Sequence, residues 1–171
     1  MTFPTTLKIT DDTGFLAIVN ADKYHSFVGA EWELIQLKDR FVDEMNNNNL
    51  IIWATGHENE WNVIFLDKPS ENIPFREFSK TIHVTNGKLF LTNYEDLTMA
   101  AQFQEEKIPQ AHNAELYINL DDGMYEFTIR QLFDPGDYDY IAQETTNFEV
   151  VIRPSFTEER PKTDKVFWWK E

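Results

Sequence analysis

The sequence predicts a mainly β protein of the α+β class, an antiparallel β-sandwich with one long helix from the N-terminal half packed on it. Two observations carry this prediction. Short β-prone runs recur along the chain between turn residues, whereas only one long stretch has helical periodicity. No regular alternation of strands and helices, which would build a parallel sheet, is present. With 171 residues, we expect a single domain over 1–171 with a docked C-terminal tail.

The N-terminal half supplies two strands and the helix. Leu7–Asn20 reads as two strands around a turn at Asp11–Gly14, because Asp and Gly tolerate turn geometry. Gly29–Asn49 is predicted to contain the long helix, and the asparagine run Asn46–Asn49 is predicted to end it with a left-handed cap. The apolar stripe of this helix consists of Leu34, Leu37, Phe41 and Met45, widened by Ile35 and Val42.

The rest of the chain is predicted to be mostly β. Two hairpins are expected, one around Asn86-Gly87 and one around Asp122-Gly123, because such pairs between alternating apolar residues favour tight turns. The other expected elements are strands within Leu50–Gly56, Trp61–Asp67 and Asn147–Pro154, a short helical turn within Tyr94–Phe103, and a tail ending in the docked aromatics Phe167, Trp168 and Trp169.

The net charge restricts the class of partner. Fifteen Lys and Arg against thirty Asp and Glu give −15 at pH 7, with a pI near 4.6. Such a field repels phosphate backbones and anionic lipid, so we expect no direct binding to nucleic acid or membrane. It favours fast association with a cationic protein. The alternative is that the acids serve solubility.

The composition also points to a cytoplasmic protein without catalytic machinery. There are no cysteines, the N-terminal residues lack the pattern of a secretion signal, and no apolar run approaches the length of a membrane helix. No nucleophile elbow or phosphate-binding glycine loop is present. His57, beside Glu58 and Glu60, lacks a second histidine at metal-binding spacing. We therefore expect no enzyme, no catalytic residue, no cofactor and no metal site.

One acidic segment, Phe133–Glu144, is the predicted partner-binding loop. It holds four acids, two tyrosines and no base, and between Glu115 and Glu149 nine acids stand against one base, Arg130. Tyrosine suits interface anchors, and carboxylates beside it can pair with Arg or Lys and steer encounter. The predicted contact residues are Asp134, Asp137, Tyr138, Asp139, Tyr140 and Glu144.

Three alternatives for this segment and its surroundings stay open. The four acids of the loop could bind calcium, although their spacing departs from the EF-hand pattern. Exposed Trp61 or Trp168 could form a glycan platform on a ligand-binding sandwich. The loop could also be an ordinary solvated connection.

Two segments of this chain, Ile82–Asn93 and Glu115–Leu132, resemble two related groups of small bacterial proteins. One is the competence protein J family of nuclease inhibitors, and the other is the immunity proteins that protect cells from polymorphic or contact-delivered toxins. The resemblance covers roughly Lys80–Arg153 and includes a strand, an Asp-Gly turn followed by Tyr125, and a second alternating strand. It implies a non-enzymatic inhibitor that binds a cognate toxin, often a nuclease, and it carries over no functional residue.

Overall fold

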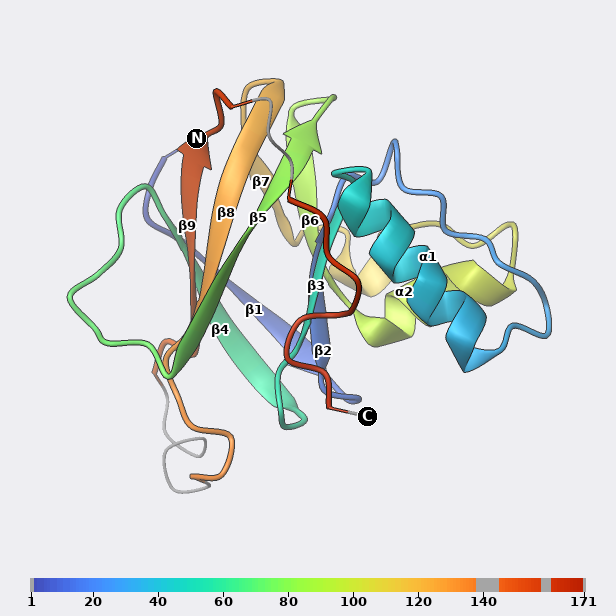
Figure 1. Ribbon diagram of the computed structural model, residues 1–171, viewed down its shortest axis with the longest axis horizontal. Helices are drawn as coiled ribbons and strands as arrows, with labels where there is room; N and C mark the ends of the chain where they lie inside the picture. Colours follow the sequence, from blue (N-terminus) through green and yellow to red (C-terminus); the bar gives the residue numbers. More distant parts are fainter. Residues whose placement is uncertain (1, 138–144, 158–160, 171) are drawn as a thin grey trace.

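The structure is a computed structural model that describes residues 2–137, 145–157 and 161–170. Two α-helices, one 3-10 turn and nine strands lie in this part of the chain (Figure 1). In chain order they are β1 (Thr5–Asp11), β2 (Phe15–Val19), α1 (Leu34–Asn46), β3 (Leu50–Ala54), β4 (Asn59–Leu66), β5 (Arg76–Val84), β6 (Lys88–Asn93), α2 (Tyr94–Gln102), η1 (Ala111–Asn113), β7 (Tyr117–Asn119), β8 (Gly123–Gln131) and β9 (Phe148–Pro154).

The strands form two sheets, with the order β1-β4-β9-β8-β5 in one and β3-β2-β6-β7 in the other. The predicted mainly β, α+β class is confirmed. The expectation of purely antiparallel pairing is wrong at one place, because β4 and β9 are parallel, with Val63 opposite Phe148. A parallel pair needs a long connection, and here β5 to β8 and α2 lie between the two strands in sequence, where no local turn signal reveals the pairing.

Both predicted hairpins are wrong, although both turns exist. Gly87 has φ 72° and Gly123 has φ 150°, but β5 does not pair with β6, and β7 does not pair with β8. Instead β5 pairs antiparallel with β8 along nine residues, from Arg76 opposite Gln131 to Val84 opposite Gly123. β6 lies in the other sheet between β2 and β7. Each turn therefore carries the chain from one sheet to the other.

The same crossing occurs at the other short turns, between β1 and β2 and between β3 and β4. Crossing places the apolar face of each strand on a core that both sheets share. This core contains Ile9 and Trp61 from the five-stranded sheet together with Ile18 and Leu91 from the four-stranded sheet. Alternation of apolar residues, the signal that predicted hairpins, is equally satisfied by this arrangement.

The turn between β1 and β2 is held by a buried carboxylate. Asp11, 1% exposed, accepts hydrogen bonds at Oδ1 from the backbone N–H groups of Thr13, Gly14 and Phe15. Its Oδ2 accepts bonds of 2.8 Å from the Thr55 hydroxyl and from the indole N–H of Trp61. The predicted Asx-type turn is confirmed, and it also joins the two sheets through one side chain.

Helix α1 is shorter than the predicted segment, and its buried stripe is narrower. Leu37, Phe41 and Met45 are buried, whereas Leu34 and Ile35 in its first turn are 49% and 64% exposed. The helix begins with a capping box in which the Glu33 N–H donates to the Gln36 side chain. The predicted asparagine stop is confirmed, because the helix ends at Asn46 and Asn48 has φ 62°.

The helices cover one face of the four-stranded sheet, on the side away from the five-stranded sheet (Figure 1). A second apolar cluster lies between the helices and the four-stranded sheet, and it contains Val19, Phe41, Ile52 and Leu97. The predicted helical turn after Asn93 is the nine-residue helix α2, and the Asn93 side chain caps it by accepting the N–H of Asp96 at 3.0 Å. The prediction of one helix thus missed the second.

The C-terminal segment 161–170 runs along the open side between β3 and β5 (Figure 1). The Ala54 N–H donates to the Phe167 carbonyl at 2.9 Å, and Trp53 and Phe167 form an isolated parallel bridge. The Phe167 ring stacks on Phe78 of β5 with 3.8 Å between centroids. This segment thereby occupies part of the edge of β3 and contacts both sheets.

Candidate partner-binding face

The β8–β9 connection, residues 132–147, carries the predicted partner-binding loop, and its first residues are anchored in the core. Phe133 is 2% exposed and stacks on Trp61 at 4.7 Å between ring centroids. Pro135 lies over Gly56, where an added Cβ would stand 2.7 Å from the proline Cγ. Because Gly56 also has φ 86°, this close approach requires glycine.

The C-terminal end of the connection is bonded to β4, and the other end is bonded to that C-terminal end. The Leu132 N–H donates to the Asn147 carbonyl at 2.9 Å, which brings the two ends together. The Asn62 N–H donates to the Asn147 side chain at 2.8 Å, and the Asn62 amide donates to the Thr145 carbonyl at 3.1 Å. These hydrogen bonds therefore fix the two ends of the connection next to each other.

Of the predicted contact residues, Asp134 and Asp137 lie in the described part of the chain, and both are exposed. Asp134 starts a turn in which its Oδ1 accepts the Gly136 N–H at 2.8 Å and its carbonyl accepts the Asp137 N–H at 2.9 Å. Tyr138, Asp139, Tyr140 and Glu144 lie outside the described residues, so their part in the predicted surface stays a prediction.

We call the end of the molecule formed by the β1–β2 turn, the β3–β4 turn and the β8–β9 connection the loop end. In Figure 1 the two turns and the described residues of the connection lie together at the bottom of the view, and Gly56 contacts Pro135 while the Thr55 N–H donates to the Gly14 carbonyl. The turns bring the exposed carboxylates of Asp12 and Glu58 to the same end as Asp134 and Asp137. Sequence reasoning missed this grouping, because nothing local shows that turns more than a hundred residues apart meet.

Two exposed apolar side chains lie beside the base of the loop. Ile73 is 92% and Phe75 is 51% exposed. Ile73 lines a shallow pocket with Leu132 and Thr145, and the Phe75 N–H donates to the Gln131 carbonyl at 2.8 Å. Sequence reasoning missed these residues too. The sequence does contain a pattern that could have indicated their exposure: residues 67–75 form a polar connection with two prolines, and an Ile and a Phe stand within it.

A second unpredicted feature at the loop end is a pocket of about 490 Å³ next to Pro135. Its lining includes the β3–β4 turn, the start of β2 and the C-terminal aromatics. The guanidinium of Arg76 lies in its wall, 4.3 Å from the Trp168 ring centroid. Burial lowers the pKa of Arg76 from its ordinary value.

Three charged side chains that are buried elsewhere, those of Arg130, Glu149 and Asp96, have partners within the fold. Arg130 is buried on the outer face of the five-stranded sheet, where it pairs with Glu149 and, at 3.2 Å, with Glu77. Glu149 also accepts the Ser70 hydroxyl, and Asp96 accepts the Thr92 hydroxyl at 2.9 Å. Such bonds satisfy groups that would otherwise be costly to bury.

The structure bears on two of the alternatives that the sequence left open, the glycan platform and the metal site. Trp61 is fully buried, so the idea that it forms an exposed glycan platform is wrong; its ring fills the core and its N–H is bonded to Asp11. Trp168 is half-buried in the pocket wall. Across the described residues, no group of three or more His, Cys, Asp or Glu side chains could hold a metal ion. No helix there is long and apolar enough to cross a membrane.

The fold defined by these elements is similar to the folds of two proteins of known structure. ComJ from Bacillus subtilis, an inhibitor of the DNA-degrading activity of NucA, superposes with a TM-score of 0.53 at 11% identity over 88% of this chain and 96% of ComJ. The product of crocagin biosynthetic gene J superposes with the same TM-score and identity, over 88% of this chain and 95% of its own.

The resemblance of the hairpin-like segments to the competence protein J family is thus confirmed at the level of fold, and it extends well beyond Lys80–Arg153. No family model matches the sequence, and no curated protein matches it significantly. In the sequence, only the turns and the alternating strands indicated this similarity of fold.

Proposed function

We propose that this chain is a non-enzymatic immunity or inhibitor protein that binds and neutralises a cognate toxin domain, a nuclease with a basic surface, in the bacterial cytoplasm. The observation that carries the proposal is the similarity of fold to ComJ along nearly the whole length of that inhibitor. The proposal places the contact at the loop end and on the acidic segment Phe133–Glu144.

The charge of the chain supports a basic partner. At −15, it would attract a cationic protein over distances near the Debye length, which raises the association rate. A nuclease domain needs positive charge where it holds the phosphates of DNA. Exposed carboxylates such as those of Asp134 and Asp137 could occupy that surface in place of phosphates.

The exposed apolar residues support a contact at the same place. Interfaces combine apolar anchors with a polar rim, and an apolar side chain that is almost fully exposed on a folded protein marks a candidate anchor. Ile73 lines a pocket with Leu132, and the Phe75 N–H donates to the Gln131 carbonyl, so both lie beside the start of the connection that carries Asp134. Phe133 stacks on Trp61, so this end of the loop is already fixed and loses little entropy on binding.

The architecture that we infer for this function is a single domain in which the two sheets form a β-sandwich. It is supported by the single apolar cluster to which both sheets contribute. A rigid sandwich with turns at its ends would present the loop end without rearrangement.

The proposal is tested with the protein encoded by the gene next to that of this chain. We expect a complex in a low-salt pull-down and inhibition of DNA degradation by that protein. Failure to form a complex at low salt, or a complex that leaves the activity of the partner intact, would contradict the proposal.

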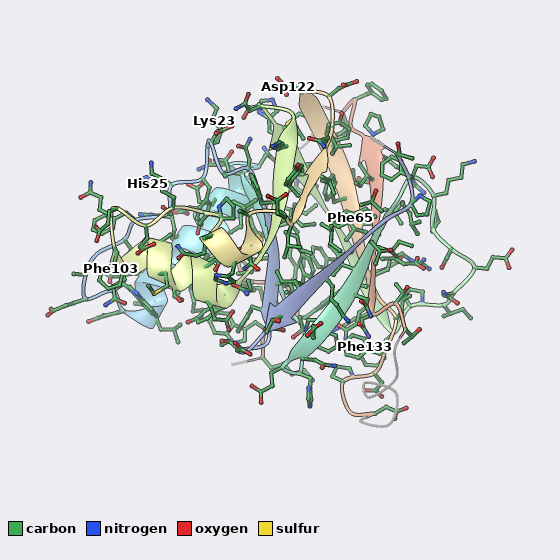
Figure 2. The ribbon with its side chains drawn as sticks, turned by 180° about the vertical axis from the view of Figure 1, so that it is seen from behind. Lys23, His25, Phe65, Phe103, Asp122 and Phe133 are labelled. Atoms are coloured by element: carbon green, nitrogen blue, oxygen red, sulfur yellow. The ribbon has the colours of Figure 1, made fainter. Side chains whose placement is uncertain are left out.

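A matched pair of charge reversals tests the place of contact. Asp134→Lys with Asp137→Lys should slow association by about tenfold and weaken its dependence on salt. The control, Glu105→Lys with Glu115→Lys, makes the same change of net charge at exposed positions near the helical side. Figure 2 shows Phe103 and Phe133, which mark the two regions, on opposite sides of the molecule. If both double variants slowed association equally, the contact would not lie at the loop.

A further inference from the structure

The pocket at the loop end differs in charge from the rest of the molecule. The chain as a whole has twice as many acids as bases. In the part of the chain that the structure describes, the pocket lining, in contrast, includes two cations, Arg76 and Lys170, against one carboxylate, Glu58. A volume of about 490 Å³ lies within the range of small-molecule sites.

Arg76 is held in this pocket by uncharged acceptors. Its Nε donates to the Gln131 side chain at 2.7 Å, and its Nη2 donates to the Ala54 carbonyl at 3.2 Å. These bonds leave both N–H groups of Nη1 without an acceptor among the described residues. No acidic side chain in that part of the chain forms an ion pair with Arg76. A partly buried guanidinium of this kind favours an external anion with planar, two-oxygen geometry.

Flat aromatic groups surround this cation. The guanidinium carbon lies 4.3 Å from the Trp168 ring centroid and 5.8 Å from that of Phe75. Phe15 and Trp169 also line the pocket and meet edge to face, with 5.1 Å between their centroids. Aromatic walls of this kind accept a flat apolar group beside the charged one.

The backbone at Trp168 adds an independent observation. Its φ of 64° places a bulky residue that is not glycine in the left-handed region. Such conformations cost free energy and cluster at ligand clamps. The Phe167 carbonyl, bonded to Ala54, and the Phe167 ring, stacked on Phe78, hold this position.

We propose that this pocket binds a carboxylate carried on a flat apolar group, with Arg76 pairing with the carboxylate and Trp168 and Trp169 enclosing the apolar part. The pocket lies at the same loop end as the proposed toxin contact, but this site is inferred from the pocket lining and not from the toxin-binding proposal. The carboxylate can belong to a free aryl acid or to the C-terminus of a peptide that ends in an aromatic residue.

The test is a titration of the ¹⁵N-labelled full chain, followed by NMR, with phenylacetate, its neutral analogue phenylacetamide, and acetate. We expect saturating shifts of the indole N–H signals at the pocket with phenylacetate alone. Two further ligands, the tripeptide Gly-Gly-Phe with a free C-terminus and its C-terminal amide, separate the two sources. Tighter binding of the free tripeptide than of phenylacetate would assign the site to peptide termini, and the reverse would assign it to free acids.

Two variants test the role of the cations. Arg76→Gln should weaken binding about tenfold or more, which corresponds to the loss of a hydrogen-bonded charge pair. The matched control Arg153→Gln, at an exposed position on β9, should leave binding unchanged. Lys170→Gln, at an exposed position that cannot disturb the fold, should weaken binding by about twofold to fivefold.

The proposal is overturned by any of three results. These are the absence of saturable binding by both acids, equal binding of phenylacetate and phenylacetamide, and equal binding by the native chain and Arg76→Gln when the ¹⁵N spectrum of the variant shows an intact fold.

Discussion

Two aspartates at the loop end stand in similar sequence settings and have opposite surroundings. Asp11 and Asp134 each begin a turn that contains a glycine, and each accepts a backbone N–H at Oδ1. Asp11 is 1% exposed and also bonds Thr55 and Trp61, whereas Asp134 is exposed. The comparison teaches that the same local turn chemistry can stabilise the core or leave a carboxylate available to a partner.

The difference comes from what the rest of the chain places around each turn. The β1–β2 turn passes between the sheets, so Asp11 meets donors from β4 and from the β3–β4 turn. Asp134 lies directly beyond Phe133, at the end of the five-stranded sheet (Figure 2), where its side chain is exposed. Four substitutions test this contrast between a buried and an exposed part of the loop end. They are ordered from the largest to the smallest expected loss of stability.

Asp11→Ala should cost the most. It leaves three backbone N–H groups and the Trp61 indole N–H without their acceptor, whereas the Thr55 hydroxyl keeps the His57 carbonyl at 2.8 Å. Each buried donor left unpaired costs about 1–3 kcal/mol. We expect the free energy of unfolding to fall on the order of 5 kcal/mol, measured by urea denaturation. Asp12→Ala, at the exposed neighbouring position, is the control and should change it by less than about 0.5 kcal/mol. Similar values for the two variants would refute the structural role of Asp11.

Phe133→Ala tests the anchor of the acidic loop. The ring is buried against Trp61 and Phe148, and truncation of a buried Phe costs about 3–5 kcal/mol. Phe156→Ala removes an equal side chain that is 93% exposed, so thermal unfolding should hardly change. A stable Phe133→Ala variant would mean that the loop base is not part of the core.

Gly56→Ala tests the contact between the loop base and the β3–β4 turn. The added methyl would meet Pro135 at 2.7 Å in a backbone with φ 86°, at a cost of about 1–3 kcal/mol. At Gly29 an added Cβ has no heavy atom within 4 Å, so Gly29→Ala is the control with unchanged or slightly raised stability. Chemical denaturation of both variants makes the comparison, and equal stability would show that the contact can relax freely.

Asp134→Ala should have the smallest effect on stability. An exposed turn residue contributes less than about 0.5 kcal/mol, since the turn also keeps the bond from the Asp137 N–H to the Asp134 carbonyl. Its effect should instead appear as a slower association with the proposed partner, with little change in dissociation. Stopped-flow measurements at two salt concentrations separate these rates. A loss of stability as large as that of Asp11→Ala would remove the contrast between the two residues.

The outcome for individual elements shows what local patterns can predict. The end of α1 at the asparagine run, the turns at Gly87 and Gly123 and the turn at Asp11 follow from the backbone preferences of single residues. The pairing of the strands on either side of those turns does not, because alternation indicates one buried face without identifying the sheet that shares it. The parallel pair β4–β9 is likewise a long-range property.

The candidate site also has features that the sequence predicts and features that it does not. The acidity of the β8–β9 segment follows directly from its residue types, and Asp134 and Asp137 are exposed as a surface site requires. Ile73, Phe75 and the Arg76 pocket were not predicted. Exposure depends on which neighbours pack around a side chain, and the pocket assembles residues from five separate parts of the chain.

By itself, the sequence determined the mainly β class, the positions of the turns, the helix stop and the negative charge, because each depends on residue type and on neighbours a few positions away. Only the tertiary structure decided that the short turns cross between sheets, that Asp11 is buried while Asp134 is exposed, and that a positively charged pocket lies beside an acidic loop. The physical reason is that burial, pairing and local potential are set by contacts between residues far apart in the chain, which local preferences do not encode.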